Sequence, residues 1–222
     1  NAWQMARVRG REVRDWSKNL PQKFQKFLDS IEGKEVEEKD KELKKFLDEY
    51  MDRNYVYLES KLEKTKEWFE ETWSDVEEDY FKRLEEITGE NISFDNCVGY
   101  LTAFNRNPMI IETKEFFVYY LKSPWAAAKT SAHEIMHFHY YDIWEKKYNG
   151  MLDQKQNWVL SEAMTVLLNT EFSDMFVLKD YGHGRTDGLR ENIVEIWKQS
   201  EDYDDFMKKS IDYVKKIDVS NM

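Results

Sequence analysis

The feature that most limits the fold of this chain is a helical repeat of apolar residues in its first ninety positions. Apolar side chains recur there in steps of three and four, first from Phe24 to Ile31 and then from Leu43 to Ile87, with Lys and Glu between them. Only three Pro and eight Gly interrupt the 222 residues, and Gly33 and Gly89 are expected to end helices. The sequence therefore predicts a predominantly helical protein, with residues 1–90 as an N-terminal segment of amphipathic helices.

A change of composition after residue 90 predicts short strands. Polar and turn-forming residues give way to β-branched and aromatic runs, which predict two or three strands within Cys97–Phe104 and Met109–Leu121. Turns are expected at Asn105–Pro108 and near Thr113–Lys114. We therefore expect a small, mostly antiparallel sheet.

Ser123 and Pro124 predict the start of a long helix, because serine suits the N-cap and proline suits the first helical position. This helix is expected to run to about Tyr148, and a second one is expected over Asn157–Leu168. The overall prediction is an α+β fold in which the sheet packs on these two helices, with residues 91–222 forming one domain.

Charge and cysteine content exclude several classes of protein. The formal net charge of -11 argues against nucleic acid as a partner, because phosphate binding needs clustered Lys and Arg. Cys97 is the only cysteine, so no internal disulfide can form. The sequence contains no run of about 18 to 20 apolar residues, the length that a membrane-spanning helix needs. These observations favour a cytoplasmic protein, although a chain that begins at Asn1 is also compatible with a removed leader peptide.

The sequence His133-Glu134-Ile135-Met136-His137 lies within the first of the two predicted helices. Residues four apart lie one turn apart on the same helix face, so both imidazoles can reach one metal ion while Glu134 lies at its edge. The pattern predicts a zinc site, and the alternative is a pair of histidines without a metal.

A catalytic zinc with an open position needs a third protein ligand, for which three residues are candidates. His139 is expected to point away from His137, because two residues span about half a helical turn. Glu162 lies among apolar neighbours, where a carboxylate is costly unless a charged partner or a metal compensates it. His183, between Gly182 and Gly184, could bind the metal or donate a hydrogen bond to a developing oxyanion.

Residues 97–172 resemble the catalytic region of the gluzincin clan of metallopeptidases. The resemblance rests on the HExxH motif, on Glu162 in the next helix and on the strand-rich segment before the motif. By its order of elements the chain is similar to the compact minigluzincin type. The resemblance implies a zincin-like catalytic domain with zinc held by His133, His137 and Glu162. It differs at Val166, where many gluzincins carry an aspartate that orients a zinc-binding histidine. Support for the ligands is therefore expected from Asp142, Thr165 or Asn169.

The function that the resemblance implies is zinc-dependent hydrolysis of peptide bonds. Glu134 would act as general base toward a metal-activated water, and His183, with Tyr181 or Arg185 as alternates, would stabilise the oxyanion. No Gly-Ala-Met-Glu-Asn stretch of the related aminopeptidases is present, which favours an endopeptidase. Its peptide or protein substrate is expected to pair with an exposed strand in Met109–Leu121.

The sequence is also compatible with two other functions. One is a catalytically latent or non-catalytic metal-binding protein that is regulated by its N-terminal helices, through an intramolecular contact or a partner. The other is a purely structural helical interaction protein, which predicts no bound metal.

Overall fold

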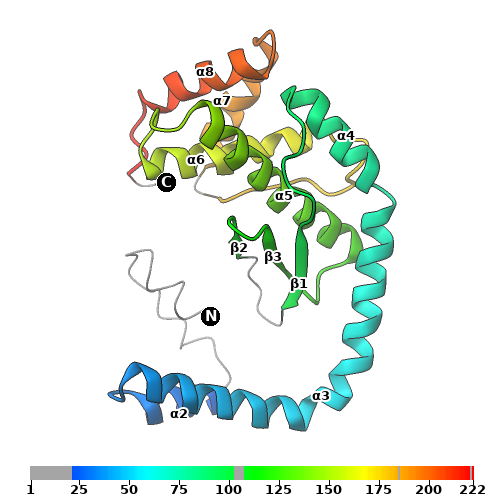
Figure 1. Ribbon diagram of the computed structural model, residues 1–222, viewed down its shortest axis with the longest axis vertical. Helices are drawn as coiled ribbons and strands as arrows, with labels where there is room; N and C mark the ends of the chain where they lie inside the picture. The colour runs from blue at the N-terminus through cyan, green and yellow to red at the C-terminus, as the bar shows by residue number, and fades with distance from the viewer. Residues whose placement is uncertain (1–21, 103–107, 185, 221) are drawn as a thin grey trace. The chain divides into compact units, whose positions relative to one another are not determined.

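The structure is a computed structural model that describes residues 22–102, 108–184, 186–220 and 222, without the side chains of 22–25, 47, 50 and 51–58. Most of the described chain is helical (Figure 1). The helices are α2 (Gln22–Ile31), α3 (Val36–Ser74), α4 (Glu77–Thr88), α5 (Pro124–Lys147), α6 (Gln154–Met164), α7 (Asp187–Lys198) and α8 (Tyr203–Val214). Gly33 and Gly89 follow α2 and α4 with positive φ of 85° and 66°, as their predicted roles at helix ends require.

Contacts divide the chain into two compact units, Asn1–Ser60 and Lys61–Met222, and α3 runs from one into the other. Helix α4 belongs to the second unit, where the hydroxyl of the buried Tyr80 donates to the carbonyl oxygen of Ala132 in α5 at 2.6 Å. The boundary predicted from the sequence, after residue 90, instead places α4 in the N-terminal segment. None of the described helices combines the length and the apolar character that a membrane crossing needs.

The sheet has three strands, β1 (Val98–Thr102), β2 (Met109–Ile110) and β3 (Glu115–Tyr119), in the order β1-β3-β2. β1 pairs with β3 in parallel over five residues, and β2 pairs with β3 antiparallel over two. The prediction of a mostly antiparallel sheet is therefore wrong, and the sheet is mixed. Runs of β-branched and aromatic residues predict strands but carry no information on which strand becomes the neighbour of which.

The turns predicted between the strands have different outcomes. The turn near Thr113–Lys114 is present over residues 111–114, where Lys114 has a φ of 56°. For the turn predicted at Asn105–Pro108, residues 105–107 lie outside the described residues, as do residues 103 and 104 at the end of the first predicted strand.

Helix α5 lies between the sheet and the helices α6 to α8 (Figure 1). Its N-cap Ser123 accepts a hydrogen bond from the amide of Ala126, and Pro124 is its first residue, as predicted. Phe116 of β3 is buried, with its ring centroid 6.3 Å from that of Phe138 in α5. The sheet is thus held on α5 by burial of apolar side chains.

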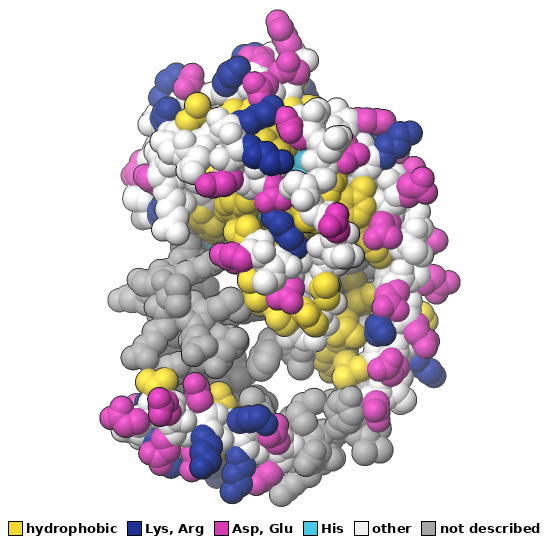
Figure 2. Space-filling model, viewed as in Figure 1, with side chains coloured by type: hydrophobic (Ala, Val, Ile, Leu, Met, Phe, Trp, Pro, Cys, Tyr) yellow, Lys and Arg dark blue, Asp and Glu magenta, His cyan; other side chains and the backbone are white. Residues whose placement is uncertain are grey.

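The outer face of the sheet is partly covered by its own aromatic side chains. Tyr100 of β1 lies opposite Phe117 of β3, with ring centroids 5.4 Å apart. Val98 and Tyr100 of β1 are both exposed. Figure 2 shows that hydrophobic side chains on the viewed face of the molecule are interspersed with acidic and basic ones. Such mixed exposure is ordinary for a protein surface.

The second predicted helix changes its geometry partway. A capping box formed by Asp153 and Gln156 begins α6, and Val159, Leu160 and Ala163 are fully buried. The α-helix ends at Met164 and a 3₁₀ helix, η2 (Thr165–Asn169), follows, whereas the sequence predicted one helix to Leu168. Glu162 therefore lies in the last turn of α6, directly before this change.

Candidate metal site

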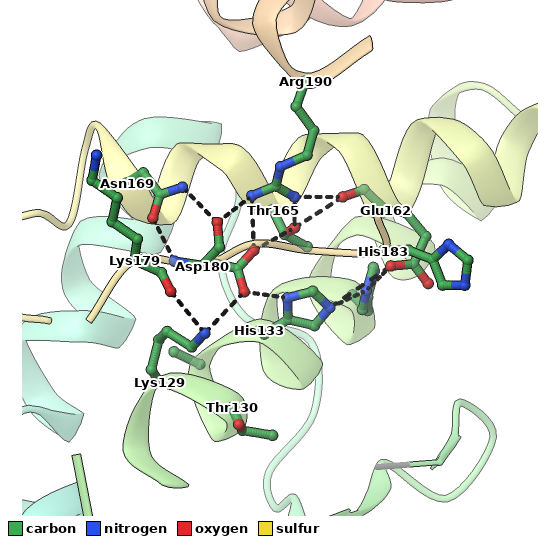
Figure 3. Close-up of polar contacts among 12 residues, drawn as sticks. Lys129, Thr130, His133, Glu162, Thr165, Asn169, Lys179, Asp180, His183 and Arg190 are labelled. Carbon is green, nitrogen blue, oxygen red and sulfur yellow. Dashed lines mark hydrogen bonds and ion pairs between the residues drawn. The ribbon is translucent and has the colours of Figure 1, made fainter. Parts of the chain in front are cut away.

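Three candidate ligand side chains meet where α5 and α6 pack against each other (Figure 3). The Nε2 atoms of His133 and His137, one turn apart on α5, lie 3.0 Å from each other. Oε2 of Glu162, from α6, lies 3.9 Å from each of these nitrogens. These residues are the ones that the sequence predicted as ligands, and the two helices bring their donor atoms within 4.8 Å of one another.

The distances among the three atoms fit a metal ion. A triangle with sides of 3.0, 3.9 and 3.9 Å has a centre about 2.1 Å from every corner, within the range of metal bonds to histidine nitrogen and carboxylate oxygen. Two imidazoles and one carboxylate are ordinary ligands for divalent transition metals. The His133 and Glu162 side chains are 14% and 15% exposed, so the cluster could hold a metal ion that solvent still reaches.

Glu134 follows His133 on α5 and is buried. Burial raises the pKa of its carboxyl to about 7, although the neighbouring His133 acts in the opposite direction. Glu134 is not one of the three clustered ligand residues. Glu134 thus neighbours a candidate ligand in the chain but does not belong to the ligand set.

The other histidines lie in different surroundings. His139 is buried, with its Nε2 atom 2.8 Å from the Thr88 hydroxyl, away from the cluster as predicted. The His183 ring packs edge-on against Trp158, one turn before Glu162 on α6, with centroids 5.3 Å apart. Its Nδ1 atom is buried without a hydrogen-bond partner among the described residues. Of the two alternates to His183, Tyr181 is 75% exposed and Arg185 lies outside the described residues.

The sequence reasoning missed one residue at the site, Asp180. Its Oδ1 atom accepts a hydrogen bond from Nδ1 of His133 at 3.1 Å, on the opposite side of the ring from the other ligands (Figure 3). Asp180 is 5% exposed, although it lies in a segment without helix or strand. Periodicity gives no signal in such a segment, and only its position near the glycine-rich run 181–184 could have drawn attention to it.

Of the three residues expected to support the ligands, Asp142 contacts other side chains, and the side chains of Thr165 and Asn169 act on the ligand side chains through Asp180. Asp142 pairs with Lys114 at 2.5 Å and accepts from the Ser93 hydroxyl. Thr165 and Asn169 instead contact Asp180. The Thr165 hydroxyl lies 3.0 Å from Oδ2, and the Asn169 amide group binds both main-chain polar groups of Asp180.

Arg190 of α7 connects these groups from the other side (Figure 3). One terminal nitrogen of its guanidinium lies 2.9 Å from both Oδ2 and the carbonyl oxygen of Asp180, and the other donates to the Thr165 hydroxyl and the Glu162 carbonyl oxygen. Burial alone would raise the pKa of Asp180, but the hydrogen bond from His133 and the positive charges of Arg190 and Lys129 hold it well below its usual range. The carboxylate of Asp180 is therefore ionised.

Asp180 and burial also make the two histidines electrostatically different. Burial lowers the pKa of His133, but the hydrogen bond and charge of Asp180 outweigh this effect and raise it. Burial, with the nearby His133, lowers the pKa of His137 well below its ordinary value. Among the described residues, a carboxylate is hydrogen-bonded to Nδ1 of His133, and none is hydrogen-bonded to Nδ1 of His137.

A cavity of about 760 Å³ lies further along α5. Its wall includes Tyr141, whose ring centroid is 6.5 Å from that of His137. The α6 N-terminus and the turn between β2 and β3 form other parts of the wall, through Asp153 and Glu112 among others. The cavity thus begins one helical turn from the candidate ligands.

Comparisons with protein-family models, with curated proteins and with solved structures found no match to this chain.

Proposed function

We propose that this protein is a zinc-dependent peptidase of the HExxH type, similar to the gluzincins. The observation that carries the proposal is the convergence of His133 Nε2, His137 Nε2 and Glu162 Oε2 on one point. Glu134 follows His133 in the chain and is buried. Two imidazoles and one carboxylate form a ligand set of catalytic zinc, which leaves a position open for water or substrate. A purely structural zinc would instead be enclosed by four protein ligands.

The chemistry follows from the roles of the side chains. Zinc bound there would lower the pKa of a water molecule and polarise the scissile carbonyl. Glu134 accepts the proton of the attacking water on its carboxylate and then delivers it to the leaving amine. His183 is the proposed hydrogen-bond donor to the developing oxyanion, because it packs on Trp158 within one turn of Glu162.

The proposed substrate is an internal segment of a peptide or protein. β2, within the region expected to pair with substrate, is an outer strand of the sheet, and an extended peptide can add to such a strand through main-chain hydrogen bonds. The cavity that Tyr141 lines, one helical turn from His137, offers space for substrate side chains. The absence of the Gly-Ala-Met-Glu-Asn stretch of related aminopeptidases favours an endopeptidase.

The direct test combines metal analysis with a cleavage assay. Purified protein is expected to contain about one zinc per chain and to degrade an unstructured protein such as casein. A chelator is expected to stop cleavage, and added zinc is expected to restore it. Bound zinc without cleavage would favour the non-catalytic alternative, whereas absence of any bound metal would exclude both metal-dependent functions.

Glu162 and His183 are distinguished by their expected effects on zinc and on turnover. Glu162→Ala removes a proposed ligand and is expected to weaken zinc binding strongly, as measured by competition with a chromogenic chelator. His183→Ala is expected to leave zinc in place and to lower kcat by about 10²- to 10³-fold, the usual effect of one lost oxyanion donor. If zinc leaves with His183 and stays without Glu162, the site has three histidine ligands and the gluzincin interpretation is wrong.

A further inference from the structure

We propose that Asp180 is the positioning residue of the metal site, and that Arg190 of α7 holds it in place. This inference rests on the proposed metal site. It assigns to an irregular segment and to α7 a role in metal binding that neither the HExxH motif nor Glu162 implies.

The first step is the hydrogen bond between His133 and Asp180. Oδ1 of Asp180 lies 3.1 Å from Nδ1 of His133, while Arg190 donates to Oδ2 of the same side chain. A carboxylate oxygen accepts, so Nδ1 of His133 is the donor in this hydrogen bond. In a neutral imidazole, Nε2 then has its lone pair free, and this atom faces His137 and Glu162. Asp180 therefore selects the tautomer of His133 that can bind a metal, and it fixes the orientation of the ring.

The second step is the restraint on Asp180 itself. The Asn169 side-chain oxygen accepts from its amide at 2.6 Å, and the Asn169 nitrogen donates to its carbonyl oxygen at 2.7 Å. Thr165 and Arg190 contact Oδ2, and Lys129 lies 3.5 Å from Oδ1. An irregular segment is ordinarily a poor support for a site, and these contacts supply the rigidity that a helix would otherwise provide.

The third step is the space that Gly182 leaves for Arg190. Gly182 has a φ of 57°, and a Cβ atom at this position would lie 2.2 Å from a terminal nitrogen of Arg190. A side chain at residue 182 would therefore displace the guanidinium from Asp180, in addition to straining the backbone. The buried guanidinium also compensates the charge of Asp180, which would otherwise be costly to bury.

The alternative supports for the ligands are absent from the described part of the site. Position 166, four residues after Glu162, is occupied by Val166, whose side chain is part of the hydrophobic core. Nδ1 of His137 has no hydrogen-bond partner among the described residues. Loss of the Asp180 carboxylate is thus expected to act on His133 alone, without a second carboxylate to replace it.

The test is the isosteric substitution Asp180→Asn. His133 donates to one oxygen of Asp180, and Arg190 and Thr165 donate to the other. An asparagine has a single side-chain oxygen, so in either orientation of its amide an NH₂ group faces a donor. We expect the dissociation constant for zinc, measured by chelator competition, to rise about 10- to 100-fold. With saturating cobalt in place of zinc, the visible absorption bands are expected to shift, because the ligand field of His133 changes. A purely structural defect would reduce the amount of bound cobalt without moving the bands.

Asp174→Asn is the matched control, because Asp174 also pairs with an arginine, Arg83, but is exposed. This variant is expected to bind zinc with the wild-type affinity and to give the wild-type cobalt spectrum. If Asp180→Asn does not fold, Thr165→Val nearly keeps the side-chain volume and removes the hydroxyl that contacts Oδ2 of Asp180 and accepts from Arg190. It is expected to weaken zinc binding in the same direction by a smaller factor.

The outcomes separate this inference from the proposed function. If Asp180→Asn leaves the zinc affinity and the cobalt spectrum unchanged, the role of Asp180 is disproved and the metal site is not. If that variant does not fold, unchanged zinc affinity in Thr165→Val has the same meaning. Binding of zinc by the wild-type protein without peptide cleavage would overturn the peptidase and leave the role of Asp180 testable by affinity alone. A wild-type protein that binds no metal would overturn both.

Discussion

Replacing Glu134 with glutamine is expected to reduce casein cleavage by about 10²- to 10⁴-fold while the protein retains its zinc. Glutamine preserves the size of the side chain but cannot take a proton from water, so only the proton-transfer step is removed. Glu134 lies next to His133 on α5 but outside the three-residue ligand cluster, so its loss leaves the ligand atoms unchanged. Initial cleavage rates and the zinc content of the same protein sample measure the two effects together.

Glu191→Gln is a suitable control for this variant, because Glu191 is an exposed glutamate on α7. It is expected to retain both zinc and the wild-type rate. Loss of zinc together with activity in Glu134→Gln would show that Glu134 is a ligand. Full activity in Glu134→Gln would exclude the proposed general base.

Replacing both His133 and His137 with alanine is expected to lower the zinc content from about one ion per chain to none. Two of the three proposed ligand atoms are lost, and a single carboxylate in water binds zinc weakly compared with a complete site. Peptide cleavage is expected to disappear with the metal. Elemental analysis of the purified variant, with circular dichroism to establish its fold, measures the effect.

His139→Gln provides the control, since His139 is on the same helix but contacts Thr88. This variant is expected to retain zinc because its side chain is no part of the cluster. Stoichiometric zinc in a folded His133→Ala/His137→Ala protein would disprove the proposed site. Zinc loss from His139→Gln at equal fold content would show that the metal binds elsewhere on α5.

The local features of the fold could be predicted because they depend on residues close together in the chain. Gly33 and Gly89 end helices through their left-handed conformations, and Ser123 with Pro124 begins α5. Strand pairing could not be predicted in this way. The parallel pairing of β1 with β3 and the short antiparallel pairing of β2 depend on how the sheet covers Phe138 and the rest of α5.

The ligand candidates could be predicted from the sequence for two reasons. A four-residue spacing on a helix places His133 and His137 on one face, and a carboxylate among apolar residues needs a partner. The position of Glu162 near both histidines, and of Asp180 and Arg190 behind His133, depends on how the helices pack. Residues 133, 180 and 190 belong to a helix, an irregular segment and another helix, and no local pattern relates them. Their contact exists because the packing of α5, α6 and α7 brings together polar groups that must satisfy one another once they are buried.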